Sequence, residues 1–428
     1  MKIYIEKNLS RESLAKLTGH KASDPATVMP QVRKIISDVK RNGFSAVQRY
    51  NKHFDNNSSP VLKVSVSEMN KAGSELSTEL KKAMKTAFAN INKFHKKQKP
   101  AGYTLSTMPG VRCSMEYRPI ESIGLYIPGG TAPLPSTMLM LGIPAMIAGC
   151  KEISVFTPAP EGRVHPAVLY AASLCGITTV YKAGGAHAIA AAAYGTEQNN
   201  KVYKIFGPGN RYVTAAKILV SSDPEGAAID FPAGPSEVLV IANEKADPVY
   251  IAADLLSQAE HGTDSRALCL VFSEAKAKEI AAETKKQLAL LPRNEIAAQA
   301  LRNSFILVCR SIESAIAFSN ETAPEHLILN MEQPEKILPL ITNAGSVFLG
   351  AYSPESAGDY ASGTNHSLPT EGYAKVYGGV TVSAFMKSMT VQKISKKGIA
   401  ALGKTVITMA EAEGLEAHAR AVKVRMKK

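Results

Sequence analysis

The stretch SQAEHGTDS carries an amide and an imidazole of the kinds that bind metal ions in proteins. Gln258 and His261 follow the apolar run ADPVYIAADLL, whose spacing is typical of a helix. Residues three apart on a helix share one face, so the two side chains are expected to point the same way. They would form half of a zinc site, and the remaining ligands must come from elsewhere in the chain.

Three later segments offer candidate partners for this half-site. They are PEHL with Glu325 and His326, SAGDYASGTNH with Asp359 and His366, and EAEGLEAHA with Glu413, Glu416 and His418. Imidazole and carboxylate groups of this kind suit zinc. The adjacent pair Glu325 and His326 also suits proton transfer, because imidazole titrates near neutral pH.

Nucleophilic catalysis is the competing hypothesis. The five cysteines are widely scattered without a CxxC pair, which indicates a reducing compartment and favours the cytoplasm. Cys113 follows Arg112, a neighbour that lowers a thiol pKa, whereas Cys150 is expected to end a helix, where the helix dipole gives no such help. The GxSxG pattern of serine hydrolases is absent from the sequence.

Three glycine-rich turns could bind a phosphate-bearing cofactor. IPGGTAP (127–133), AGGAHA (183–188) and FGPGN (206–210) each follow a predicted strand. Glycine lets a ligand approach the backbone, and ligands of open α/β sheets bind where strands end. None of the three turns has the GxGxxG spacing of a dinucleotide fingerprint, so tight turns remain the alternative.

The elements around these residues predict an α/β fold. Helical spacing dominates the first 120 residues, with a glycine break at Gly43, and from 119 short β-branched runs alternate with Ala-rich helices. Such alternation indicates parallel sheets built from right-handed βαβ units. We expect an N-terminal extension (1–21), one α/β domain from 22–124 and 236–377, a second from 125–235, and a C-terminal extension (378–428) that begins with a strand-like VTVSAFM.

Bulk properties narrow the class of protein further. The 428 residues carry a formal net charge of +13, with basic clusters at 93–99, 395–398 and the C-terminus. None lies in a nucleic-acid motif, so solvated basic faces are the simpler interpretation. No charge-free run of about 20 apolar residues predicts a membrane span, and the first residues lack the apolar core of a signal peptide.

Together these segments resemble the histidinol dehydrogenase family over nearly the whole chain. The segments are GLYIPGGTAPLPST, KIFGPGN, DFPAGPSEVLV, LLSQAEHG, PEHL, AGDYASGTNH and GLEAHA. The resemblance implies two incomplete Rossmann-like domains, and oxidation of L-histidinol to L-histidine through L-histidinaldehyde with two NAD in succession. It further implies Zn²⁺ at a site shared between the subunits of a homodimer, with the C-terminal ligand coming from the partner.

The same resemblance assigns roles position by position. The metal ligands would be Gln258, His261, Asp359 and His418. The acid–base pair would be Glu325 and His326. Substrate contacts would be these six residues with Ser236, His366 and Glu413. The cofactor contacts would be Tyr126, His187 and Asn210. His187 departs from the pattern, because the family usually has glutamine there.

Other functions stay open at this point. Another NAD-dependent alcohol or aldehyde dehydrogenase, including a cysteine-dependent one, is the nearest alternative enzyme. A zinc hydrolase would need no NAD. A basic nucleic-acid-binding protein would bind in a salt-sensitive way without zinc. The resemblance itself implies no nucleic acid and no membrane partner.

Overall fold

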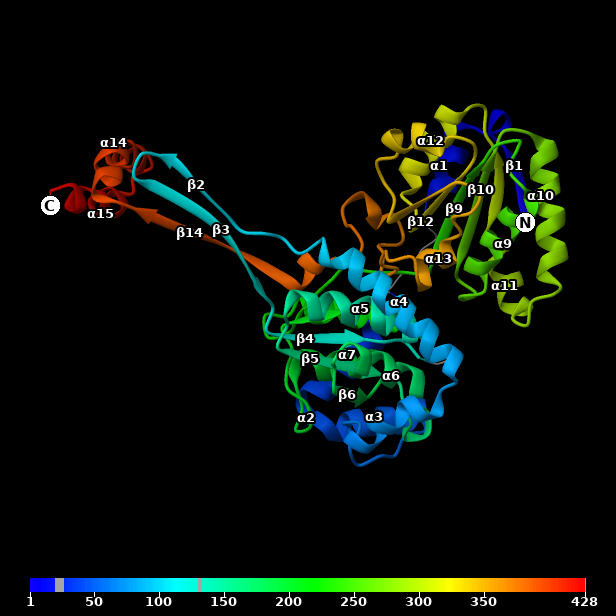
Figure 1. The fold of residues 1–428 in the computed structure, drawn as a ribbon, viewed down its shortest axis with the longest axis horizontal. Helices are drawn as coiled ribbons and strands as arrows, with labels where there is room; N and C mark the ends of the chain where they lie inside the picture. The colour runs from blue at the N-terminus through cyan, green and yellow to red at the C-terminus, as the bar shows by residue number, and fades with distance from the viewer. Residues whose placement is uncertain (20–26, 130–132, 428) are drawn as a thin grey trace.

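Two α/β domains and a long projecting arm make up the molecule (Figure 1). The computed structural model describes residues 1–19, 27–129 and 133–427. Parallel sheets form the centre of each domain, and the arm is a narrow antiparallel ribbon that ends in two helices.

The first domain is built on a six-stranded parallel sheet in the order β1-β11-β10-β9-β12-β13. Its strands are β1 (Lys2–Ile5), β9 (Glu237–Ala242), β10 (Arg266–Val271), β11 (Phe305–Val308), β12 (His326–Asn330) and β13 (Ser346–Leu349). Its helices are α1 (Arg11–Thr18), α9 (Pro248–Ala259), α10 (Glu274–Leu288), α11 (Asn294–Ala300), α12 (Ile312–Thr322) and α13 (Glu355–Tyr360). Every residue of β9 and β12 is buried, as expected for central parallel strands covered on both faces.

The second domain has a five-stranded parallel sheet in the order β6-β5-β4-β7-β8. Its strands are β4 (Ser122–Tyr126), β5 (Glu152–Thr157), β6 (Thr179–Lys182), β7 (Lys204–Phe206) and β8 (Ala228–Ile229). Between them run α5 (Pro135–Ala148), α6 (Pro166–Leu174), α7 (Gly185–Tyr194) and α8 (Arg211–Ser221). The strand order reverses between β4 and β7, which is the switch point of a doubly wound sheet.

Three N-terminal helices also cover this second sheet: α2 (Met29–Asp55), α3 (Val66–Ala72) and α4 (Thr78–Lys96). Helix α2 packs against α7 and α8, α3 against α6, and α4 against α5. The predicted glycine break in α2 is confirmed, because Gly43 has φ 53° and ψ −134° inside the helix.

The arm consists of β2 (Tyr103–Met108), β3 (Val111–Pro119) and β14 (Met386–Ile394), followed by α14 (Lys396–Ala412) and α15 (Glu416–Met426). Strand β3 pairs antiparallel with both β2 and β14, which joins residues near 110 to residues near 390. Figure 1 shows the C-terminus at the far end of this arm.

The predicted fold class is confirmed, but part of the predicted domain division is wrong. Strand β1 of the supposed extension 1–21 pairs with β11 inside the six-stranded sheet. The helices of 22–124 pack mainly against the helices of the five-stranded sheet. Helix α4 also reaches the 236–377 segment, where Asn90 donates to the carbonyl of Ala361 at 2.9 Å. An amphipathic helix shows that one face is buried, but its sequence does not say which sheet buries it. The boundary at 21/22 lies outside the described residues.

The strand predicted within 380–386 is also misplaced. Residues Val382–Phe385 form a 3₁₀ turn, and the strand is β14, which begins at Met386. Within the described part of the chain, no helix is both long enough and apolar enough to cross a membrane.

Candidate active site between the two domains

A cleft of about 720 Å³ lies between the two domains. It is formed at the carboxyl ends of β4 and β7, which contribute Pro128 and Asn210, and at the amino ends of β9 and β12. Eight sequence-predicted site residues line it: Asn210, Ser236, Gln258, His261, Glu325, His326, Asp359 and His366. The structure therefore brings most of the predicted site together.

The end of α9 places Gln258 and His261. Asp247 caps the start of this helix by accepting the N–H of Val249 at 2.8 Å, and Pro248 occupies the first turn. The helix ends at Ala259, so His261 lies just beyond it rather than within it. Its N–H still donates to the carbonyl of Gln258 at 3.3 Å, which continues the turn and keeps both side chains at the cleft.

A buried carboxylate–imidazole pair stands at the start of β12. Glu325 and His326 are 6% and 3% exposed, and Glu325 Oε2 lies 3.5 Å from His326 Nδ1. The N–H of Glu237 donates to Glu325 Oε2 at 2.9 Å, and burial raises the pKa of the Glu325 carboxyl. His326 Nδ1 donates to the carbonyl of Glu237 at 3.1 Å, so a backbone group of β9 fixes the ring.

The second ring nitrogen of His326 faces Asp359. Nε2 lies 3.2 Å from Asp359 Oδ1. Burial opposes protonation of the ring, but the charge of Glu325 and the hydrogen bonds to Asp359 and Glu325 outweigh it, so the pKa of His326 lies well above its ordinary value. Burial likewise acts to raise the pKa of Asp359, but His326 more than compensates and lowers it. Two carboxylates thus lie against the ring, one at each ring nitrogen, and both favour its protonated form.

Asp359 belongs to α13, and the segment after this helix carries His366. His366 Nδ1 donates to the carbonyl of Asp359 at 2.8 Å, and its Nε2 lies 3.1 Å from the hydroxyl of Thr137 on α5. Burial lowers the pKa of His366, against the charge of Asp359. His366 thus links the two domains across the cleft.

Two predicted cofactor contacts lie outside this cleft. His187 is 1% exposed, with Nε2 2.9 Å from Asn51 Oδ1 and burial lowering its pKa to about 3. Its ring lies beside those of Tyr50 and Phe54, inside the α2–α7 contact. Tyr126 is 4% exposed, and its hydroxyl accepts the N–H of Gly185. Of the glycine-rich turns, those at 127–133 and 206–210 reach the cleft, though 130–132 lie outside the described residues.

Two other predicted residues lie on the arm. Glu413 is the C-cap residue just after α14, His418 is in the first turn of α15, and both are exposed. Helix α15 packs against α14, and Figure 1 shows it at the end of the arm, away from the domain that holds Gln258 and His261. The chain does not bring His418 to its own cleft.

The residues that line the cleft fit part of a zinc site. Within the described part of the chain, no three His, Cys, Asp or Glu side chains cluster in a way that could hold a metal ion. The cleft nevertheless holds an amide, an imidazole and a carboxylate at Gln258, His261 and Asp359, a mixed oxygen and nitrogen set that suits zinc when one more ligand is added.

The cysteines take no part in this site. Among the described lining residues there is no cysteine. Cys113 lies on arm strand β3, and burial raises the pKa of Cys150, two residues after α5, to about 11. A buried thiol of high pKa is a poor nucleophile, so nothing here favours a cysteine mechanism.

Two residues at the site were missed from the sequence. Glu355 is 1% exposed at the start of α13, and burial raises its pKa to about 8. Its position four residues before Asp359 would have placed both carboxylates on one helix face. Thr137 meets His366 from the other domain, and no local signal in the sequence predicts that contact.

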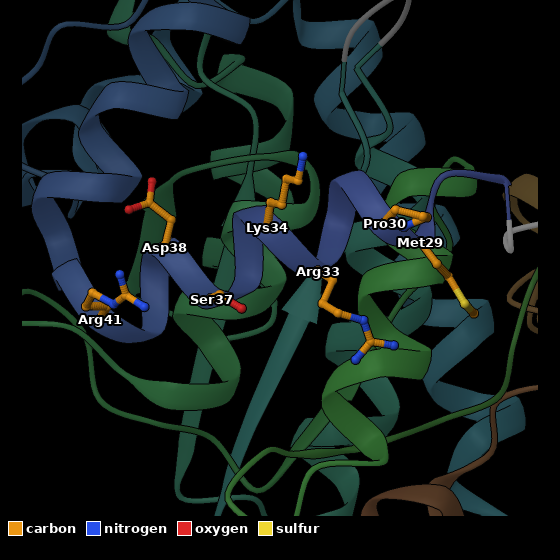
Figure 2. Close-up of a pocket in the computed structure, with 7 residues that line it drawn as sticks. All are labelled: Met29, Pro30, Arg33, Lys34, Ser37, Asp38 and Arg41. Carbon is orange, nitrogen blue, oxygen red and sulfur yellow. The ribbon is translucent and has the colours of Figure 1, made fainter.

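A second hollow lies on the surface of α2. Figure 2 shows its seven residues, Met29, Pro30, Arg33, Lys34, Ser37, Asp38 and Arg41, along this one helix. None of them is a predicted site residue, and one helix alone encloses no ligand. The cleft between the domains remains the candidate active site.

Fold and site together define a two-domain α/β enzyme with a buried acid–base pair beside a set of potential metal ligands. The sequence profile of histidinol dehydrogenase matches residues 19–426. The histidinol dehydrogenase of Vibrio parahaemolyticus is 50% identical over 429 residues, which cover 100% of this chain and 99% of the relative. That of Bacteroides thetaiotaomicron is 50% identical over 418 residues, covering 97% of each.

Solved structures agree with these sequence matches. The crystal structure of histidinol dehydrogenase from Elizabethkingia anophelis has a TM-score of 0.95 and 50% identity, and the match covers 100% of this chain and 98% of that one. A proline utilization A structure with a TM-score of 0.51 and 12% identity, covering 89% of this chain and 47% of that one, shares the fold alone. The chain belongs to the histidinol dehydrogenase family, and it is therefore an oxidoreductase.

Proposed function

We propose that the cleft oxidises L-histidinol to L-histidine through L-histidinaldehyde, the last two steps of histidine biosynthesis, with two NAD and a bound Zn²⁺. Family membership at 50% identity over the full chain supports the reaction. The single observation that carries the mechanism is the buried pair Glu325 and His326, held beside Gln258, His261 and Asp359 in one cleft.

Zinc, NAD and the side chains of the cleft would each have a separate role in the reaction. Zinc would act as a template that holds the substrate through nitrogen ligands, and each NAD would accept one hydride. Gln258, His261 and Asp359 would hold the metal. Ser236 and His366, which also line the cleft, would contact the substrate, and Asn210 at the start of α8 would lie on the cofactor side. Fixing both reactants in one cleft supplies the orientation that the hydride transfer needs.

His326 is the proposed general base. Its Nδ1–H donates to the carbonyl of Glu237, which fixes the ring. A cation held by Asp359 would offset the carboxylate that favours the protonated ring, and Nε2 would then be the nitrogen that takes and returns a proton. In the first step Nε2 takes the hydroxyl proton of the alcohol as a hydride leaves the carbinol carbon. In the second step it takes a proton from the hydrated aldehyde as the second hydride leaves.

Glu325 is proposed to activate the water that hydrates the aldehyde. Its raised pKa suits a group that accepts a proton from water near neutral pH. Glu325→Gln is therefore expected to slow oxidation of the aldehyde by about 10²-fold or more, and oxidation of the alcohol much less. Stopped-flow measurement of each half-reaction checks this, and equal losses in both would contradict the assignment.

Stoichiometry tests the function as a whole. Purified protein with L-histidinol and excess NAD is expected to form two NADH for each histidinol consumed, and a chelator is expected to abolish the reaction until zinc is restored. One NADH with release of the aldehyde would instead favour another NAD-dependent alcohol dehydrogenase. Unchanged activity in chelator would remove zinc from the proposal.

A homodimer with shared active sites completes the proposal. The arm carries His418 and Glu413 away from the cleft of their own chain, and apolar side chains such as Leu105, Met389 and Leu415 are exposed along it. Burial of these side chains against a second copy would bring His418 to the partner's cleft as the fourth metal ligand and Glu413 as a substrate contact. Such a two-fold arrangement makes both sites equivalent.

A further inference from the structure

A buried carboxyl group stands directly behind Gln258. Glu355 is 1% exposed, and both of its oxygens lie 2.9 Å from the side-chain nitrogen of Gln258. The hydroxyl of Ser257 donates to Glu355 Oε1 at 2.8 Å. Both partners come from the last turn of α9, so this carboxyl group is fully engaged with the element that carries the first proposed metal ligand.

The contact between Glu355 and Gln258 orients the side-chain amide of Gln258. With its nitrogen on Glu355, the oxygen of Gln258 accepts the N–H of Glu237 at 3.2 Å, beside the carboxylate of Glu325, which accepts the same N–H. The reverse orientation would set the amide oxygen against two carboxylate oxygens and its nitrogen against an N–H donor. Hydrogen bonding therefore favours the first orientation.

Amide orientation matters because a divalent cation binds an amide through its oxygen and not through its nitrogen. Glu355 also starts α13, whose later residue Asp359 is the proposed carboxylate ligand. One buried side chain thus connects the end of α9 with the helix that carries Asp359.

We propose that Glu355 is a positioning residue for the metal site, which holds the amide nitrogen of Gln258 so that the second lone pair of the amide oxygen, beside the one on the N–H of Glu237, faces the cation. This inference rests on the proposed zinc site. It makes Glu355 part of the outer shell of the site without giving it contact with substrate or cofactor. Outer-shell partners of metal ligands change metal affinity by about 10- to 100-fold.

Zinc affinity measured by chelator competition on metal-depleted protein tests the proposal. Glu355→Leu is expected to weaken zinc binding about 10- to 100-fold, because the nitrogen of Gln258 loses its acceptor. Glu355→Gln is expected to bind zinc more tightly than Glu355→Leu, since its own amide oxygen still accepts one N–H. The matched control is Glu6→Gln, a buried acid of the same domain that accepts hydrogen bonds from Arg310 and Ser314 instead, and it is expected to change affinity by no more than about 2-fold.

A double-mutant cycle separates positioning from general damage. If Glu355 acts through Gln258, adding Glu355→Leu to Gln258→Ala should cost no more than about 2-fold further affinity. The same loss in both backgrounds would overturn the proposal, as would unchanged zinc affinity in Glu355→Leu. If Glu355→Leu does not fold, the cycle is run with Glu355→Gln. The proposal is again overturned if Glu355→Gln lowers zinc affinity as much in the Gln258→Ala background as in the wild-type chain. Failure of the wild-type chain to bind zinc would instead count against the proposed function.

Discussion

Replacing His326 with Asn is expected to lower kcat for histidinol oxidation by about 10²- to 10⁴-fold, the range that a general base contributes. Asparagine can still donate a hydrogen bond to the carbonyl of Glu237, but it has no nitrogen that takes a proton. Because both oxidation steps need that proton transfer, both half-reactions should slow together, in contrast to Glu325→Gln.

Zinc content separates this role from metal binding. His326 touches Asp359 at 3.2 Å, so damage to a metal ligand is the rival explanation for any loss of turnover. Elemental analysis of His326→Asn should show zinc near the wild-type content per chain. Loss of zinc in parallel with activity would refute the division of labour between His326 and Asp359. His53→Asn, an exposed histidine on α2, is the matched control and should leave both quantities unchanged.

The sequence predicted the sheets well because buried strands carry a strong local signal. All of the predicted runs from 119 to 350 contain strands, and those of β9 and β12 are buried throughout. The arm strands were missed for the opposite reason. Tyr103–Met108 is exposed along nearly its whole length, so no alternation of buried and exposed residues marks it as a strand. Strand β2 pairs locally with β3, but β3 pairs on its other side with β14 near residue 390, a non-local contact that no local pattern reports.

The sequence predicted the position of a site residue correctly where local structure alone places the side chain. It failed where contacts between distant elements determine where the side chain lies. Gln258 and His261 reach the cleft because the last turn of α9 carries the first and the turn that follows the helix carries the second. His187 instead turns toward Asn51 of α2, a residue 136 positions earlier in the chain. No local pattern reports that α2 covers α7, so the ring's burial could not be predicted from the turn AGGAHA.

The sequence pattern did not predict which edge of the six-stranded sheet faces the cleft. Ligands of open parallel sheets bind at the carboxyl ends of strands, and the five-stranded sheet obeys this rule with β4 and β7. The six-stranded sheet presents the amino ends of β9 and β12 to the same cleft, where Ser236, Glu325 and His326 lie. The five-stranded sheet therefore contributes residues from the carboxyl ends of its strands at the switch point, whereas the six-stranded sheet contributes residues from the amino ends of its strands.

Mixing two inactive variants is expected to restore activity if His418 serves the partner's cleft. His418→Asn removes a ligand carried by the arm, and Asp359→Asn removes one carried by the body. Each homodimer then lacks a ligand at both sites. A mixed dimer has one site that combines the intact body of the first chain with the intact arm of the second. Random pairing of equal amounts should restore about a quarter of the wild-type activity.

The control for complementation uses two defects on the body. Asp359→Asn mixed with His326→Asn leaves every site of every dimer damaged, because both residues line the cleft of their own chain. No activity should return in that mixture under the same refolding or co-expression. Absence of recovery in the His418→Asn mixture, with dimers verified by size, would mean that His418 does not act across the interface. Recovery in the first mixture alone places the fourth ligand on the arm of the neighbouring subunit, since His418 lies on α15 at the end of the arm and packs there against α14.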